Sequence, residues 1–141
     1  MKKKIVVLAL VSVLYILFFP VFFHNVLYKQ YTINIHTAGE KCPESGGTEV
    51  WINRILADGQ ETDLSAYSLA DGWEYNGRIF SSGSSECTLT LKLHAVKKIE
   101  IEFVTHPYSG IVQIQSRDKK TDTVNLYSDT ESYVIKDFII D

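Results

Sequence analysis

Apolar and polar side chains alternate from residue 31 to the end of the chain, and this two-residue period limits the possible folds more than any other feature. Residues 87–94, CTLTLKLH, show the period most clearly, because Leu89, Leu91 and Leu93 would share one face of a β-strand. Such a face packs against a second layer, whereas the threonines and lysine between the leucines stay in water. The pattern therefore predicts half-buried strands.

Turn residues divide this part of the chain into roughly eight or nine short strands. The strongest turn signal is Asn76-Gly77, which lies between the two arms of residues 73–80 and predicts a tight hairpin. Residues 61–69 fit either a short strand or an irregular loop. The spacing predicts an all-β fold, an antiparallel β-sandwich of the jelly-roll or immunoglobulin type. The other expected strands cover residues 31–37, 47–56, 87–94, 98–106, 110–116, 123–128 and 132–140.

Residues 5–23 differ from the rest, since they form an apolar run without a charge. As a helix rising ~1.5 Å per residue, the run would just cross a hydrocarbon core of roughly 30 Å. It ends in bulky aromatic residues where a cleaved signal peptide would have small ones, so an uncleaved signal-anchor is favoured over a cleaved leader. A buried core helix does not fit, because the run has no polar face.

The expected organisation is therefore a lysine stub and transmembrane anchor in residues 1–29, followed by one domain in residues 30–141. The three lysines at positions 2–4 should stay in the cytoplasm, which places the domain outside the cell. We expect a single-pass protein of the cell membrane, with the membrane itself as a partner through residues 5–23.

Charge is distributed unevenly along the chain. All 17 acidic residues follow Gly39, whereas four of the 14 basic residues lie within the first 29 positions. The remainder holds ten basic residues and carries a net charge of −7. An acidic domain repels polyanions, so nucleic acid is not expected as a partner.

The only two cysteines, Cys42 and Cys87, both lie in the part expected outside the cell. An even pair in an oxidising compartment predicts a disulfide. It would close a loop of about 46 residues and stabilise the domain by roughly 4 kcal/mol. With the opposite orientation across the membrane, both would be free thiols.

Signatures of catalysis and of metal binding are scarce. The sequence has no Gly-x-Ser-x-Gly elbow, no His-Glu-x-x-His helix and no phosphate-binding Gly-x-x-x-x-Gly-Lys loop. Asp58, Glu61 and Asp63 could supply oxygen ligands to Ca²⁺, but they lack the spacing of an EF-hand, and a solvated turn is the better interpretation. We therefore predict no catalytic residue, no metal site and no cofactor.

Aromatic residues beside turns are the first candidates for ligand binding. Trp73 and Tyr75 lie beside the predicted hairpin turn, where we expect them to be accessible. Arg78 follows on the returning arm and could orient an anionic or hydroxylated ligand. Trp51 is expected to be buried, because large rings on strands pack in the core or against neighbouring strands.

The segment THPYSG, residues 105–110, supplies the other candidates. His106 and Tyr108 are neighbouring rings in a turn that runs into an alternating strand. Pro107 restricts φ, and Gly110 frees the backbone where the chain re-enters the sheet. We expect this segment to be first a corner between two strands, with His106 and Tyr108 as tentative ligand-binding residues.

Four segments together carry a family resemblance: TEVWINRILADGQETDL, GWEYNGRIF, VTHPYSGIVQIQ and TVNLYS. They resemble galactose-binding-like jelly rolls, in particular the membrane-proximal domains of bacterial membrane proteins that handle surface polysaccharides or transfer sugars. The resemblance covers most of the chain from residue 31 onward. It implies a non-catalytic module, sometimes carbohydrate-binding, with ligands held by loops at one end.

The resulting hypothesis is a membrane-anchored, non-catalytic binding module for cell-envelope carbohydrate, located outside the cytoplasm. The alternative is a structural or assembly domain that docks on a membrane-protein partner, such as a glycan-handling enzyme. A small hydrolase is the third and least favoured hypothesis. The sequence alone does not identify the ligand or the partner.

Overall fold

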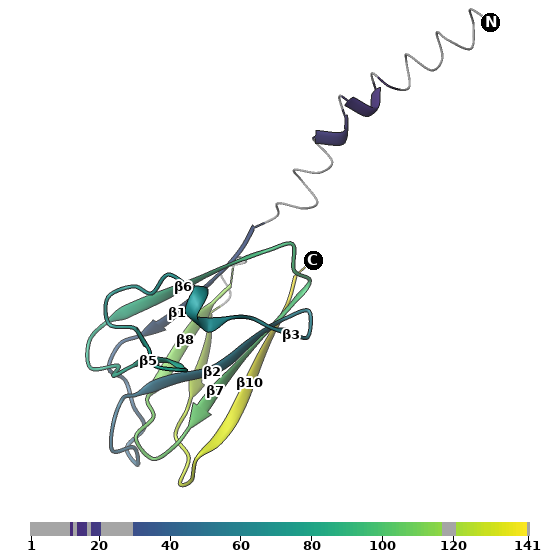
Figure 1. Cartoon of the computed structure of the whole chain (residues 1–141). Coiled ribbons are helices and arrows are strands. Elements are labelled where there is room, and N and C mark those ends of the chain that lie inside the picture. The colour runs from purple at the N-terminus through teal and green to yellow at the C-terminus, as the bar shows by residue number, and fades with distance from the viewer. Residues whose placement is uncertain (1–11, 13, 17, 21–29, 117–120, 141) are drawn as a thin grey trace, which may run out of the picture.

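The computed structural model describes residues 12, 14–16, 18–20, 30–116 and 121–140. From residue 30 onward these residues form β-strands joined by short loops, which confirms the predicted all-β fold (Figure 1). The strands are β1 (Gln30–Thr37), β2 (Val50–Ala57), β3 (Gln60–Glu61), β4 (Glu74–Tyr75), β5 (Ile79–Ser81), β6 (Cys87–His94), β7 (Lys98–Thr105), β8 (Ile111–Gln115), β9 (Thr121–Asn125) and β10 (Ser132–Ile139).

The strands pair in two antiparallel sheets that pack as a sandwich (Figure 1). One sheet has four strands in the order β6-β1-β8-β9. The other has six strands, in the order β10-β7-β2-β5-β4 with β3 paired to β2. The chain passes repeatedly from one sheet to the other, so neighbouring strands in the sequence are often in different layers.

The core lies between the two sheets and is built by the alternation seen in the sequence. Along β6, Leu89 and Leu91 are fully buried, while the residues between them are exposed. Ile33 and Ile35 of β1 are buried in the same way. Every core residue that the structure describes lies between positions 31 and 140, so residues 30–141 contain the described core of the domain.

A β-bulge interrupts the pairing of β2 with β7 between Ile52 and Arg54. It places Asn53 and Arg54 together on the outer face, opposite Glu102 of β7. Asn53 Nδ2 donates to Glu102 Oε1 at 2.6 Å, and Arg54 donates to Glu102 Oε2 at 2.8 Å. The bulge thus gives the buried Glu102 carboxylate two donors.

The Asn76-Gly77 turn forms the predicted hairpin, which joins the two short strands β4 and β5. Gly77 has φ of 97°, a left-handed conformation that favours glycine. Residues 61–69 are mostly loop, with a single 3₁₀ turn, η1 (Leu64–Ala66). Asp63 caps this turn, and its hydrogen bonds from the side chain and the backbone N–H of Ser65 lower the pKa of Asp63.

The described residues of the N-terminal segment, 12, 14–16 and 18–20, are helical. Within the described part of the chain, no helix is long and apolar enough to span a membrane. The lysine stub and the rest of the expected anchor lie outside the described residues, as do residues 117–120 of the expected turn between β8 and β9.

The predicted disulfide is not formed, because Cys42 and Cys87 are both free. Cys87 begins β6, and its Sγ lies 3.0 Å from Thr37 Oγ1. Cys42 lies in the loop after β1, near Tyr127. A hydrogen bond to Asp129 is the main cause that raises the pKa of Tyr127, and Cys42 adds to it. The number of cysteines in the sequence predicts a bond, but the described contacts of Cys87 are with Thr37, Ser81 and Gly72.

Candidate functional site

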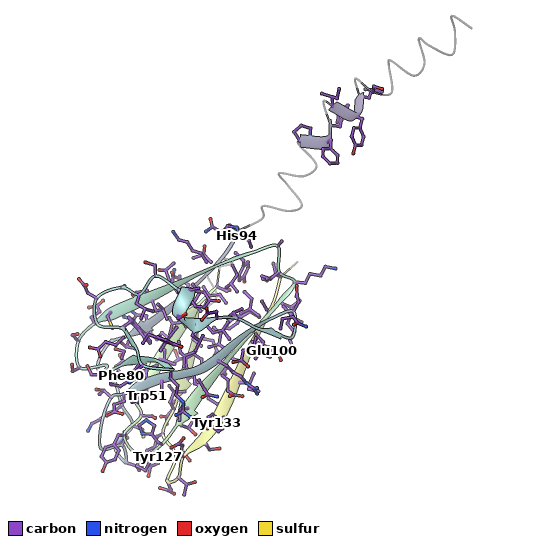
Figure 2. All side chains as sticks on the ribbon, viewed as in Figure 1. Trp51, Phe80, His94, Glu100, Tyr127 and Tyr133 are labelled. Carbon is purple, nitrogen blue, oxygen red and sulfur yellow. The ribbon has the colours of Figure 1, made fainter. Side chains whose placement is uncertain are left out.

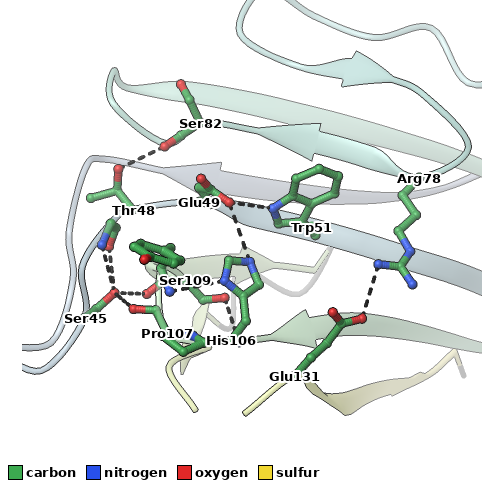
Figure 3. Close-up of polar contacts among 12 residues, drawn as sticks. Ser45, Thr48, Glu49, Trp51, Arg78, Ser82, His106, Pro107, Ser109 and Glu131 are labelled. Atoms are coloured by element: carbon green, nitrogen blue, oxygen red, sulfur yellow. Dashed lines mark hydrogen bonds and ion pairs between the residues drawn. The ribbon is translucent and has the colours of Figure 1, made fainter. Parts of the chain in front are cut away.

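The strongest candidate site is a cleft of about 430 Å³ on the outer face of the six-stranded sheet, here called the aromatic cleft (Figure 3). It lies where β2 begins and β7 ends, beside the turn that follows β7. A volume of this size suits a small ligand or a short part of a larger one. The cleft is lined by Glu49, Trp51, Arg78, Val104, His106, Pro107, Tyr108 and Glu131.

Its floor is a row of residues that the strand register places side by side. Trp51 of β2 pairs with Phe80 of β5 on one side and with Val104 of β7 on the other. Val104 in turn pairs with Tyr133 of β10. Paired residues share a face, so the rings of Phe80, Trp51 and Tyr133 follow one another across the sheet (Figure 2).

Trp51 is held in place by a packed ring and a hydrogen bond. Its ring centroid lies 4.2 Å from that of Phe80, at an interplanar angle of 38°. Its Nε1 donates to Glu49 Oε2 at 2.9 Å. Glu49 lies two residues earlier, so both side chains project from the same face of the extended chain. The indole is therefore half-buried with a defined orientation, suitable as a surface on which a ligand could stack.

His106 lies in the turn after β7 and is the next polar residue beside Glu49. Its Nε2 lies 3.6 Å from Glu49 Oε2 (Figure 3). The backbone N–H of Tyr108 donates to His106 Nδ1 at 3.1 Å. Since Nδ1 accepts, the proton of the neutral ring lies on Nε2 and faces the Glu49 carboxylate.

Ser45 anchors the turn at residues 106–109 from the opposite loop. Its Oγ lies 2.8 Å from the carbonyl oxygen of Gly47 and 2.7 Å from that of Ser109. Gly46 N–H donates to Pro107 O at 2.8 Å. Both serines are buried, so this small polar cluster is shielded from water and fixes the turn.

The same loop sets the position of Tyr108. A Cβ atom added to Gly46 would lie 2.9 Å from the Tyr108 ring, so only glycine allows the loop to approach this closely. The ring remains 59% exposed at the rim of the cleft. The turn joins β7 of one sheet to β8 of the other, so it is a corner, as expected, and also one wall of the aromatic cleft.

The opposite wall is formed by Arg78 and Glu131. The guanidinium of Arg78 lies 3.6 Å from Glu131 and 3.4 Å from the Tyr133 hydroxyl. Arg78 is about one-third exposed, and Glu131 is mostly exposed. A ligand in the cleft would therefore meet a guanidinium and carboxylates around an aromatic surface.

Three of the five predicted ligand-binding residues come together here: Arg78, His106 and Tyr108. Trp73 does not, and the prediction that it is accessible was wrong, because it is only 5% exposed and belongs to the core. Its indole nitrogen has no hydrogen-bond partner in the described structure. Tyr75 is 45% exposed, but it pairs with the buried Ile79 and so lies on the other face of the sheet from Trp51.

Sequence reasoning did not place Glu49, Trp51 or Glu131 in the cleft. Trp51 was expected in the core, but its neighbours Val50 and Ile52 face inward and turn Trp51 outward. The two-residue spacing of Glu49 and Trp51 was a signal that these side chains share a face. Glu131 carried no such signal, since it reaches the cleft only because β10 pairs with β7.

The acidic cluster at residues 58–63 has local roles. Asp58 Oδ1 accepts the backbone N–H groups of Lys97 and Lys98, at 2.9 and 2.8 Å. Among the residues that the structure describes, no group of three or more histidine, cysteine, aspartate or glutamate side chains is arranged to hold a metal ion. The carboxylate of Asp58 therefore stabilises the turn between β6 and β7 by accepting these two hydrogen bonds.

The chain was compared with family models, with curated proteins and with solved structures, and none of them matches.

Proposed function

We propose that this protein is a non-catalytic binding module whose aromatic cleft holds a carbohydrate of the cell envelope. The observation that carries the proposal is the half-buried ring of Trp51, oriented by Glu49 and flanked by Arg78 and Glu131. Small-ligand sites combine an apolar surface with a few convergent polar groups, and this cleft has both.

Sugar rings match this arrangement in chemical terms. Their C–H faces are apolar and can lie on an indole, while their hydroxyl groups both donate and accept hydrogen bonds. The carboxylates of Glu49 and Glu131 accept from hydroxyls, and the guanidinium of Arg78 donates to them. Hydrogen bonds with charged groups are stronger than neutral ones, which would fix the orientation of a ligand stacked on Trp51.

Charge favours a neutral or amino sugar over an acidic one. Arg78 is already paired with Glu131, and the neutral ring of His106 faces Glu49, so no unpaired positive charge lies among the described residues of the cleft. The domain as a whole carries an excess of acidic residues. An anionic polysaccharide would meet repulsion on approach.

The positions of the serine and histidine side chains favour a binding role over hydrolysis. Ser109, the serine nearest to His106 in the sequence, is fully buried, and its Oγ accepts the backbone N–H of His106. The imidazole faces Glu49 instead of a hydroxyl nucleophile. Nucleophilic catalysis by serine needs an accessible hydroxyl next to its base.

We also propose that the sandwich is a jelly roll of the galactose-binding-like kind, anchored outside the cytoplasm by residues 5–23. The repeated passage of the chain between two antiparallel sheets supports the first part. The lysines and the apolar run support the second. An anchor would keep the domain close to envelope glycans and raise their effective concentration, which makes weak binding useful.

A glycan array probed with residues 30–141 tests the proposal. We expect saturable binding to one or more neutral or amino-sugar glycans, and loss of that binding in Trp51→Ala. Tyr75→Ala is the matched control, because it removes an exposed ring from the other face and should bind normally. A folded domain that binds no glycan would overturn the proposal.

A second candidate, docking on a membrane-protein partner, is supported by strand β10. This strand is an edge of its sheet, and Ile135 and Ile139 on it are 49% and 72% exposed. Exposed apolar residues on an edge strand favour association with another protein. Replacing Ile135 and Ile139 with lysine should abolish co-purification with such a partner and leave glycan binding unchanged.

A further inference from the structure

We propose a second binding site, for an uncharged polysaccharide, on the outer face of the four-stranded sheet. A groove of about 380 Å³ lies there, here called the amide groove, lined by Asn34, His36, Thr88, Gln113, Gln115 and Thr121. It lies on the other sheet of the sandwich from the aromatic cleft, so the inference goes beyond the proposed function and stands on separate residues.

The strand register builds the groove as two rows across the sheet. In one row, His36 of β1 pairs with Thr88 of β6 and with Gln113 of β8. In the other, Asn34 pairs with Thr90 and with Gln115. Residues two apart on a strand share a face, so the rows lie roughly 7 Å apart along the strands.

Among the described residues, the side chains of Asn34, Gln113 and Gln115 make few hydrogen bonds. Thr90 Oγ1 donates to Asn34 Oδ1 at 3.0 Å, and no described residue accepts from the two amide hydrogens of Asn34. His36 Nδ1 lies 3.0 Å from Thr88 Oγ1. The side-chain amides of Gln113 and Gln115 make no hydrogen bond with the described residues. The groove therefore presents free donors and free acceptors next to one another.

The charge and hydrogen-bonding capacity of these side chains indicate which class of ligand fits the groove. None of the described lining residues is a lysine, arginine, aspartate or glutamate, and Glu86, whose carboxylate lies 3.8 Å from His36 Nε2, would repel a phosphate or a carboxylate. Of the described lining residues, His36 carries the aromatic ring. Amides and hydroxyls that both donate and accept are complementary to sugar hydroxyls, which do the same.

An extended polymer is favoured over a single sugar. Neighbouring strands lie about 4.8 Å apart, so the four strands present a face roughly 14 Å wide. Each neutral hydrogen bond exchanged with water contributes little, and useful affinity requires several along one chain. A polypeptide is a weaker candidate, because peptide recognition by sheets uses the backbone groups of a strand edge or apolar pockets. The described lining residues offer polar side chains from the face of the sheet and no apolar side chain.

With the aromatic cleft on one sheet and the amide groove on the other, one domain could hold two glycan segments at once. Two weak sites on one domain increase the overall binding to a polymer without any new contact.

Affinity electrophoresis of the full chain tests the proposal, in native gels containing mild detergent and dextran, galactomannan or arabinoxylan. We expect at least one of these neutral polysaccharides to retard the protein. The triple variant Asn34→Ala, Gln113→Ala and Gln115→Ala should bind it at least tenfold more weakly, while Trp51→Ala keeps most of the retardation. If the triple variant does not show the cooperative thermal unfolding of the wild type, the single variant Gln115→Ala, at an exposed position, replaces it.

Three results would overturn the proposal. The first is a folded protein that none of the polysaccharides retards. The second is retardation lost in Trp51→Ala but kept in the triple variant, which would assign all the binding to the aromatic cleft. The third is retardation by denatured casein but by no polysaccharide, which would assign a polypeptide ligand instead.

Discussion

On the inner face of the six-stranded sheet, Val50, Ile52 and Phe103 are completely buried, whereas on the outer face of the same strands Trp51 is half-buried in the floor of the aromatic cleft. Both faces are made by alternate residues of β2 and β7. Inner residues contribute to stability through packing, whereas outer residues tolerate polar and aromatic side chains because they do not pack against the second sheet. A substitution on the inner face should therefore reduce stability, whereas one on the outer face should mainly change the surface of the aromatic cleft.

The largest effect should come from the inner face. Phe103→Ala removes a fully buried ring from the middle of β7 and leaves a cavity. We expect the free energy of unfolding to fall by about 3–5 kcal/mol, as measured by chemical denaturation. A loss below about 1 kcal/mol would show that the two faces do not differ as described.

Glu102→Ala tests the limit of the comparison, because Glu102 lies on the outer face but is only 6% exposed. Its removal deprives Asn53 and Arg54 of their shared acceptor. We expect a loss of about 1–3 kcal/mol, towards the lower end because the Arg54 side chain is 42% exposed. Glu100→Ala, on the same face of β7, is the matched control and should cost less. Equal losses in both variants would argue against a special role for the bulge.

Trp51→Ala should cost less stability than the loss of an inner ring. It removes the contact with Phe80 and part of the buried surface, for an expected loss of about 1–2 kcal/mol. Trp73→Ala is the contrasting variant, with an expected loss of about 3–5 kcal/mol, because Trp73 lies in the core. Thermal unfolding of the two variants side by side would rank them, and the reverse order would contradict this assignment of the two tryptophans.

The smallest effect should come from Lys98, which donates to Glu100 at 2.9 Å on the outer face. This hydrogen bond raises the pKa of Lys98 above its ordinary value of 10.5. Its contribution to stability is therefore present below pH 10.5 and is lost as the pH rises through the raised pKa. Lys98→Gln should leave the melting temperature nearly unchanged at pH 7 and flatten its decline above pH 10.5.

The sequence predicted the layers of the fold well, because strands such as β6 show alternation along their whole length. It also located the hairpin at Asn76-Gly77, where a turn needs a left-handed glycine. It failed for Trp73, which belongs to an irregular loop where no period indicates the buried side. It failed for Glu131 as well, since the pairing of β10 with β7 is a long-range property.

Trp51 shows why a residue type alone does not determine burial. Taken by itself, a tryptophan on a strand is expected inside, but Val50 and Ile52 are also apolar, and only one of the two faces can pack against the second sheet. Two residues of β-branched shape occupy the inner face and leave the larger ring outside. The two cysteines were misjudged for a related reason: their number predicted a bond, but their positions depend on the fold.

The most direct test of the central claim is the fluorescence of Trp51 during a glycan titration. In Trp73→Phe, Trp51 is the only tryptophan of the chain, so its emission reports on the aromatic cleft alone. If the cleft binds carbohydrate, a glycan selected by the array will change this emission saturably, with the same midpoint as binding measured by calorimetry. Saturable binding in the calorimeter without any change in Trp51 emission would contradict the account and place the ligand elsewhere.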